Sequence, residues 1–313
     1  GTTKSHKCSK DKEMIRFGEQ ESHIRTVVVK KDKEYQIDMH LKHNRSKGIA
    51  INKVPIKKAS ELFGILNMVF FSPEDLNIIK NGPAERRRFL DSELCQLDKI
   101  YLSDLTTYNK ILNQRNKLLK DMVYRPDLKD TLPVWDMQLA DTGKKIIRRR
   151  EQFVKELNEI VHEIHYRISG GREELFLSYE PSVSADLLEQ ELERVKPRDL
   201  KQCQTSVGPH RDDLLFSIAG VDIRKFGSQG QQRSAALALK LAQLEYVRQE
   251  IDEFPVLLLD DVMSELDDQR RCQLLKFIDG KVQTFITVND KALIPDLSGN
   301  AYFRIIEGRI AEG

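Results

Sequence analysis

The sequence has no apolar run long enough to cross a membrane, which takes about 18 residues or more, and its first residues are polar rather than signal-like. These absences favour a cytoplasmic protein without a membrane partner. Its cysteines are few and far apart, with no C-x-x-C pair, at Cys8, Cys95, Cys203 and Cys272. This spacing argues against a disulfide framework and a structural metal site. With 40% hydrophobic residues, the chain is still apolar enough to fold, as one large or two ordinary domains.

Charge is distributed unevenly, although the net charge of the whole chain is only +2. Residues 1–60 hold 15 Lys or Arg against seven Asp or Glu, a local balance of +8. Such a segment can meet a polyanion. A well-solvated surface explains the same charges equally well, so both interpretations stay open.

Hydrophobic periodicity predicts a sheet at the start of the chain and helices in the middle. Alternating residues predict strands over 23–31, 33–43 and 48–56, and Pro83 is typical of a helix start. Helical spacing then predicts a short antiparallel arm of two helices, joined by a loop from Pro126 to Pro133, with Trp135 in the core between them. The apolar stripes of these helices run through Leu105, Tyr108, Leu112, Arg115 and Leu119, and through Ile146, Phe153, Leu157, Ile160 and Ile164.

The last part of the chain alternates strands and helices. Residues 213–226 predict a hairpin that turns at Ala219-Gly220, and a long helix follows over residues 231–251. The apolar run 256–259 then predicts a strand buried on both faces. A buried strand after a long helix is typical of α/β folds.

Paired carboxylates, Asp260 and Asp261, directly follow this apolar run. Acids at the carboxyl end of a central strand lie at the edge where α/β sheets bind ligands. The pattern resembles a Walker B element, in which the first acid helps to hold hydrated Mg²⁺ on nucleotide phosphates and the second activates water. An ordinary buried strand that runs into an acidic turn is the alternative.

A second motif, FGSQGQQR over residues 226–233, stands immediately before the long helix. Its glycines permit close backbone approach, Ser228 can cap the helix, and a helix amino terminus favours an anion. A helix that is merely capped would use the same residues. The order of the motifs favours a nucleotide site, because the turn and helix precede the paired acids, and the segment SELD over residues 264–267 follows them.

Together these strings resemble the ATP-binding-cassette ATPases of chromosome maintenance and repair, and more narrowly the RecF family of bacterial recombination mediators. The resemblance covers nearly the whole chain, through FFSPEDLNIIKNGPAERRRFLD, YNKILNQRN, VGPHRDDL, FGSQGQQRS and LLLDDVMSELD. It implies an α/β fold with the P-loop NTPase type of sheet and flanking helices. The implied ABC-type ATPase head comprises residues 1–90 and 200–313, and the inserted short helical arm comprises residues 91–199.

The resemblance also implies roles for residues that would meet a second subunit. Ser228, Gly230 and Gln231 would form the signature motif, which reaches the ATP held by the partner. Residues 264–267 would form the D-loop, so that Asp267 lies beside the nucleotide at the dimer interface.

Two further roles concern the nucleotide held by the chain itself. Asp260 would be the Walker B acid for magnesium, and Asp261 would be the catalytic acid. The strand that ends at Thr287 resembles the last one before the switch region. The next residues, Val288-Asn289-Asp290, include no histidine where many cassette ATPases have one. The identity of the switch residue therefore stays open.

No P-loop of the form G-x-x-x-x-G-K-[ST], the element that holds the β and γ phosphates, occurs in the 313 residues. The opening residues, GTTKSHKCSKDKEMIRFG, instead resemble the family segment that follows the P-loop helix. We therefore expect the first strands, the P-loop and its helix to be missing at the amino end. The family is implied to be a weak, DNA-stimulated ATPase, but this polypeptide alone is expected to bind ATP poorly and to be inactive.

Basic side chains in the helical part are candidate contacts for DNA phosphates. The triplet Arg86-Arg87-Arg88 is the weaker candidate, because arginines on a helix can simply form a solvent-exposed face. His210, Arg211 and Asp212 are interpreted as a polar turn that supports the nucleotide face rather than as an acid–base centre. The denser candidate group consists of Lys144, Lys145, Arg148, Arg149 and Arg150.

The function implied by the resemblance is recombinational repair and replication restart. The expected protein is an ATP-driven homodimer with ATP and Mg²⁺ as cofactors. It would bind single-stranded and double-stranded DNA at gaps and junctions, and help RecO and RecR to load RecA. A Rad50-like or SMC-like ATPase is the alternative, which the short arm without a C-x-x-C tip makes weaker. A non-enzymatic DNA-binding or partner-binding fragment is the other alternative, because the P-loop is missing.

Overall fold

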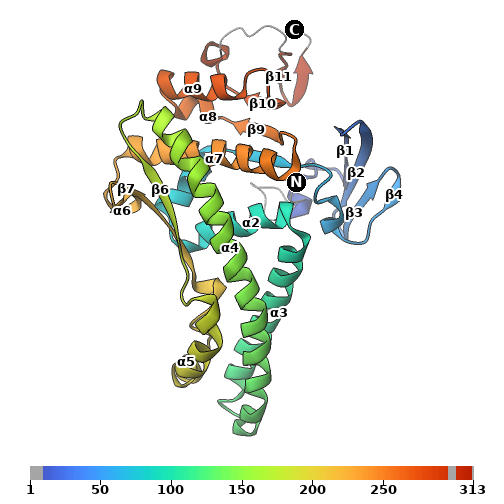
Figure 1. The fold of residues 1–313 in the computed structure, drawn as a ribbon. Helices are drawn as coiled ribbons and strands as arrows, with labels where there is room; N and C mark the ends of the chain where they lie inside the picture. Colours follow the sequence, from blue (N-terminus) through green and yellow to red (C-terminus); the bar gives the residue numbers. More distant parts are fainter. Residues whose placement is uncertain (1–9, 295–300, 312–313) are drawn as a thin grey trace.

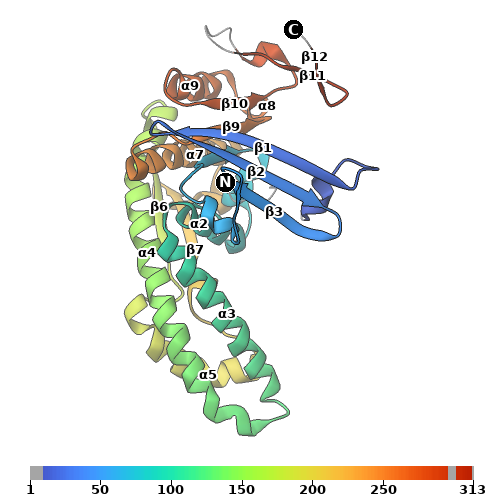
Figure 2. The same ribbon diagram turned by 90° about the vertical axis from the view of Figure 1, so that its right-hand side faces the viewer.

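The computed structural model describes residues 10–294 and 301–311, apart from the side chains of residues 59 and 60. Figures 1 and 2 show a head of sheets and helices, from one side of which a helical arm projects. This arrangement confirms the predicted α/β head with an inserted helical arm. Among the described residues, no helix is both long and apolar enough to cross a membrane.

An antiparallel sheet with the strand order β1-β2-β3-β4 forms one flank of the head (Figure 2). Its first two strands confirm the strands predicted there, although β1 is exposed along most of its length instead of burying every second residue. The prediction of one strand over 48–56 is wrong, because Asn52 and Lys53 take positive φ angles of 50° and 67° and turn the chain there. One face of the sheet packs on a small core of Ile37, Ile49 and Leu62. The strands are β1 (Glu21–Lys30), β2 (Lys33–Lys42), β3 (Arg45–Ile51) and β4 (Val54–Pro55).

A parallel sheet in the order β10-β9-β5 forms the centre of the head. Its middle strand, β9 (Val256–Asp260), confirms the predicted strand and pairs with β5 (Met68–Phe71) and β10 (Thr284–Thr287). The prediction of burial on both faces is wrong for the described residues, because Leu257 and Leu259 are buried whereas Val256 and Leu258 are only partly buried. The long helix α7 (Gln229–Ile251) is buried along most of its length and contacts both β5 and the arm helix α4 (Leu132–Ile168). The helix therefore joins the central sheet of the head to the base of the arm (Figure 1).

The arm is built on an antiparallel helix pair, α3 (Lys99–Asp121) and α4. Because α4 has 37 residues, it extends roughly 55 Å at the usual rise per residue. The loop is shorter than predicted, because Pro133 lies in the first turn of α4. A proline is tolerated there, since the backbone N–H groups of a first turn have no partner within the helix. Trp135, predicted in the core between the arm helices, packs against the main core but is only partly buried. The other arm elements are η4 (Pro126–Thr131), η5 (Ala185–Leu187) and α5 (Leu188–Gln202).

A third sheet, β6-β7-β8, lies at the base of the arm. The predicted hairpin turns at Ala219 and Gly220, both at positive φ, but residues 223–226 form a short helix instead of continuing the second strand. The strands are β6 (Leu175–Glu180), β7 (Asp213–Ile218) and β8 (Val221–Asp222). The remaining elements are η1 (Asp11–Met14), η2 (Ala59–Leu62), η3 (Pro73–Asp75), α1 (Leu76–Lys80), α2 (Pro83–Leu97), η6 (Pro209–Arg211), α6 (Ile223–Phe226), α8 (Val262–Glu265), α9 (Asp268–Ile278), η7 (Lys291–Leu293), β11 (Arg304–Ile306) and β12 (Arg309–Ala311).

The sequence-based limits of the arm, residues 91 and 199, fall inside α2 and α5. In addition, β6 from the expected arm pairs along its whole length with β7 from the expected head. The part that projects in Figures 1 and 2 comprises α3, η4, α4 and α5. The division into head and arm at those residues therefore stays a proposal.

Candidate nucleotide site and basic surface

The paired acids lie at the carboxyl end of β9, where the neighbouring strand β10 ends beside them. Thr287, the last residue of β10, is in register with Asp260. Its hydroxyl donates to Asp260 Oδ1 over 2.7 Å and accepts the backbone N–H of Asp261 over 3.1 Å. A single hydroxyl thus fixes both acids relative to the end of the sheet.

Asp261 has a left-handed backbone conformation, with φ of 54°, at the start of α8. Aspartate adopts this region more readily than most residues, and such conformations are enriched at functional sites. The Ser264 hydroxyl donates to the Asp261 carbonyl over 2.8 Å and lies 3.1 Å from its carboxylate Oδ1. The exposed carboxylate is therefore aimed by a sharp turn at the sheet edge.

The turn before α7 is a complete helix cap. Ser228 Oγ accepts the backbone N–H of Gln231 over 3.2 Å, and Gln231 Oε1 accepts the N–H of Ser228 over 2.8 Å. The preceding Gly227 has no room for a side chain, since a Cβ there would lie 2.5 Å from the Ile223 carbonyl oxygen. Ser228 itself is exposed. The cap satisfies the serine as an acceptor and leaves its hydroxyl proton to donate outward.

The Gln231 side chain also joins this turn to the loop that follows the arm helix α4. Its Nε2 donates to Glu173 Oε1 over 2.9 Å. The oxygen and the nitrogen of the Gln231 amide therefore both form hydrogen bonds within the chain, so this side chain stabilises the turn.

Asp267 caps α9, since its Oδ1 accepts the backbone N–H of Arg270 over 2.9 Å. Its Oδ2 forms an ion pair with the guanidinium of the same Arg270. The segment 264–267 is also tied to α7 by an ion pair of 2.9 Å between Arg233 and Glu265. The expected signature and D-loop segments thus lie next to each other in one subunit.

Every member of the basic group on α4 is paired with a carboxylate. The two most exposed, Lys145 and Arg148, pair with Asp141 and Asp186 and have side chains that are 54% and 64% exposed. The partners of Lys144 and Arg149 are Glu189 and Asp98. The exposed pairs of Lys145 and Arg148 are weak enough for a phosphate to compete with the carboxylate.

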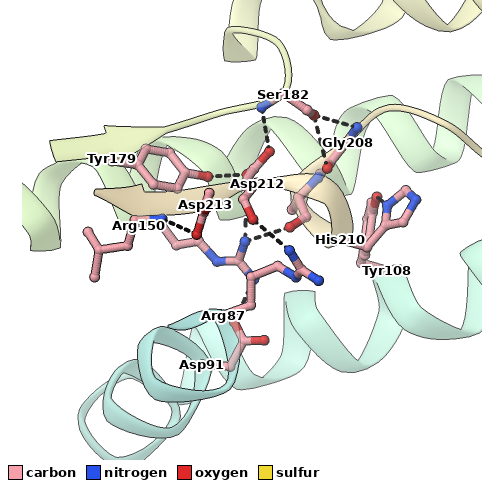
Figure 3. A network of polar contacts seen from close by, with 12 residues as sticks. Arg87, Asp91, Tyr108, Arg150, Tyr179, Ser182, Gly208, His210, Asp212 and Asp213 are labelled. Atoms are coloured by element: carbon pink, nitrogen blue, oxygen red, sulfur yellow. Dashed lines mark hydrogen bonds and ion pairs between the residues drawn. The ribbon is translucent and has the colours of Figure 1, made fainter. Parts of the chain in front are cut away.

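Arg150 has a different environment, because its side chain is only 2% exposed. Its guanidinium donates to Asp91 Oδ1 over 2.7 Å, and both residues are drawn in Figure 3. It also donates to the Pro209 carbonyl over 2.7 Å and to Tyr101 Oη over 2.9 Å. A buried, fully engaged guanidinium has no access to DNA. We therefore withdraw Arg150 from the expected DNA surface. Arg86 is buried in the same way and forms a bidentate ion pair with Asp213.

His210 lies near this network and acts as a structural group (Figure 3). Its Nε2 faces the Thr205 carbonyl at 3.1 Å, so it must carry the proton, and Nδ1 accepts from the Tyr108 hydroxyl over 2.7 Å. Burial lowers the pKa of His210 to about 4. The neutral ring matches the expectation of a supporting polar turn. Gly208 is required beside it, because at φ of 120° a Cβ would lie 2.5 Å from Tyr108 Oη.

The chain is closely similar in sequence to RecF proteins of other bacteria. The chain is 64% identical over 312 residues to the DNA replication and repair protein RecF of Agathobacter rectalis, covering 99% of this chain and 86% of that protein. It is 53% identical to the RecF protein of Lachnospira eligens, again covering 86% of it. The chain belongs to the RecF family.

Solved structures of RecF proteins have the same fold. The structure described as RecF-ATP of the RecFOR pathway, a recombination mediator, superposes with a TM-score of 0.90 at 39% identity, over 98% of this chain and 84% of that one. A second, described as RecF-ATPrS, gives 0.90 at 38% identity. No family model matches the chain. These comparisons confirm the family and the fold that the motif strings predicted, and the two solved RecF proteins are described with ATP and ATPrS.

The donor set of this RecF-family site is compatible with magnesium on a nucleotide. Mg²⁺ prefers oxygen ligands, keeps several waters and commonly uses one or two carboxylates together with substrate phosphates. Asp260 and Asp261 supply such carboxylates at the sheet edge, and the Thr287 contact orients the first of them. Within residues 10–294 and 301–311, no group of three or more His, Cys, Asp or Glu is arranged to hold a metal ion by itself.

Two residues at the site were missed by sequence reasoning. Thr287 was noted only as the end of a strand, although parallel pairing with β9 would have placed it opposite Asp260. Arg270 was not considered, because it follows the D-loop segment on the first turn of α9. The only local signal for Arg270 is its spacing of three residues from Asp267, which suits a capping aspartate.

Proposed function

We propose that two copies of the protein that contains this chain close around ATP, and that the closed dimer binds DNA at gaps and junctions. The observation that carries the proposal is the exposed, capped amino end of α7, where Ser228 presents a donor hydroxyl beside the first backbone N–H groups of a 23-residue helix. Such an end favours a phosphate group. RecF proteins of the same fold solved with nucleotide add support.

Within each site the acids of β9 have separate tasks in this proposal. Asp260, held by Thr287, helps to bind magnesium, which neutralises charge on the ATP phosphates. Asp261 orients and deprotonates the attacking water from its turn at the sheet edge. Ser228 and the amino end of α7 complete the site from the other subunit and bind the γ-phosphate. ATP then holds the dimer together, and hydrolysis releases it.

The proposed partners follow from the family. RecF is described as a recombination mediator of the RecFOR pathway, so we propose that this chain acts with RecO and RecR on DNA to load RecA. Its DNA surface would combine the exposed lysines of the β1–β4 sheet with Lys145 and Arg148 on α4. These side chains would contact phosphates rather than bases.

Replacing Asp261 by Asn tests the hydrolytic role. The amide fits the left-handed backbone but cannot take a proton from water. Because the 313 residues alone are expected to bind ATP poorly, the variant is made in the protein expressed from its complete reading frame. We expect its ATP turnover to fall by about 100-fold or more. Mg²⁺-ATP should still produce a dimer, and this dimer should persist. Sedimentation velocity over several hours, together with phosphate release, measures both effects. Normal turnover by the variant would show that Asp261 is not the catalytic acid.

Removing two cations tests the DNA surface. We expect Lys145→Ala/Arg148→Ala to reduce the salt dependence of DNA affinity, with the slope of log K against log salt falling by about 0.9 for each lost phosphate contact. The matched control is Lys117→Ala/Lys120→Ala, which removes two exposed cations from α3. Fluorescence anisotropy over a salt series measures the slope. Equal slopes for the wild type and both variants would remove α4 from the DNA surface.

A further inference from the structure

Arg270 bridges the two segments of the chain that are expected at the dimer interface. From the first turn of α9, its Nε and Nη2 donate to Ser234 Oγ on α7 over 2.9 and 2.8 Å. Nη2 also donates to the Gly230 carbonyl over 3.1 Å. The remaining Nη1 pairs with Asp267 Oδ2. One side chain therefore contacts the signature turn, the helix behind it and the last residue of the D-loop segment.

This bridge is better protected from water than the other link between the same segments. The Arg270 side chain is 23% exposed, and its acceptor Ser234 is only 4% exposed. In the Arg233–Glu265 pair both side chains are about 40% exposed. Exposed ion pairs contribute little, whereas hydrogen bonds from a charged group to sheltered acceptors contribute more. Arg270 therefore dominates the connection.

The planar shape of the guanidinium suits it to this position. Its donors point in fixed directions, so three acceptors on two segments can be held at once. The Asp267 carboxylate is likewise used on both oxygens, one for the cap of α9 and one for Arg270. Asp267 therefore supports this surface from within the subunit, and its place beside the nucleotide stays a prediction.

We propose that Arg270 is a positioning residue that holds the signature turn and the D-loop as one preformed surface for the partner subunit. This inference rests on the proposed function, because it takes both segments to meet the partner's nucleotide. Two independently moving segments would each lose conformational freedom when the dimer closes. A bridge made in the monomer has already fixed them together, so closure becomes more favourable without any new contact to ATP.

The test compares Arg270→Gln, Arg270→Lys and the control Arg233→Gln in the protein from the complete reading frame. Arg270→Gln is expected to weaken the Mg²⁺-ATP-dependent dimer by about 10-fold or more, the loss expected for charged hydrogen bonds. Arg270→Lys is expected to weaken the dimer by an intermediate factor, since a lysine ammonium group cannot reach all the acceptors. Arg233→Gln should change the dimer constant by less than about threefold. ATP affinity of the monomer should be unchanged in all three.

Sedimentation equilibrium gives the dimer constant, and binding of a fluorescent ATP analogue to dilute monomer gives the nucleotide affinity. A purely structural role would lower both together, so equal losses in the two would overturn the proposal. Ser234→Ala removes the α7 acceptor while Arg270 stays in place, and it should weaken the dimer in the same direction even where Arg270→Gln folds poorly. If Arg270→Gln or Ser234→Ala dimerises normally while Ser228→Arg does not dimerise, the positioning role of Arg270 is refuted and the proposed function stands. Normal dimers of Ser228→Arg would refute the proposed function.

Discussion

Ser228→Arg is expected to abolish dimerisation with Mg²⁺-ATP while leaving ATP binding by each subunit intact. The exposed cap of α7 would meet the γ-phosphate of the partner's ATP, and a side chain as large as arginine fills the space needed for that approach. It also removes the hydroxyl that caps the helix and donates outward. Sedimentation velocity of the protein from its complete reading frame, with and without Mg²⁺-ATP, measures the loss.

The matched control for this variant is Ser103→Arg, which adds the same side chain on an exposed position of α3 in the arm. It should dimerise as the wild type does. If Ser228→Arg also dimerises normally with ATP, the assignment of residues 228–231 to the signature motif is wrong.

Arg150→Met is expected to destabilise the fold by about 3–5 kcal/mol, the usual loss when one partner of a buried ion pair is removed. Methionine keeps much of the volume but leaves Asp91 without its cation, and it removes a donor from the Pro209 carbonyl. Asp212, which is fully buried 3.6 Å from the same guanidinium, also loses a neighbouring positive charge. Such a loss is a large share of the total stability of a typical domain.

Urea unfolding followed by circular dichroism measures this effect, and the control is Arg148→Met, two residues away on the exposed side of α4. Because the Arg148 pair is exposed, its loss should cost no more than about 1 kcal/mol. If Arg150→Met were as stable as Arg148→Met but bound DNA more weakly, Arg150 would belong to the DNA surface after all.

Helical spacing contained the information that separates these two arginines. Arg150 follows Ile146 by four residues and precedes Phe153 by three, so it lies on the buried stripe of α4, as both neighbours do. Grouping it with the other cations by adjacency in sequence produced the wrong assignment. Arg115 was placed on an apolar stripe by spacing, and it is indeed completely buried.

The partners of these arginines follow from tertiary structure and not from local pattern. Arg115 pairs with Asp199, which lies 84 residues further along the chain, and with Asp136 on α4. Strong periodicity and the motif strings were enough to predict β9, α7 and their order. The contacts of Thr287 and Arg270 depend on which strands and helices become neighbours, so they needed the three-dimensional structure.

The central claim, that the signature turn acts on the nucleotide of the other subunit, is tested most directly by complementation between two defective variants. Ser228→Arg has an intact magnesium acid, and Asp260→Ala has an intact signature turn. With Mg²⁺-ATP, neither should dimerise alone, but their mixture should form a heterodimer with one complete composite site. The control is the double variant mixed with wild type, in which every heterodimer site has one defective half. Sedimentation is followed by a fluorescent label, carried by Ser228→Arg in the first mixture and by the double variant in the control, so that wild-type homodimers are not detected. The account predicts that the labelled variant sediments as a dimer in the first mixture only, and a labelled dimer in both mixtures, or in neither, would contradict it.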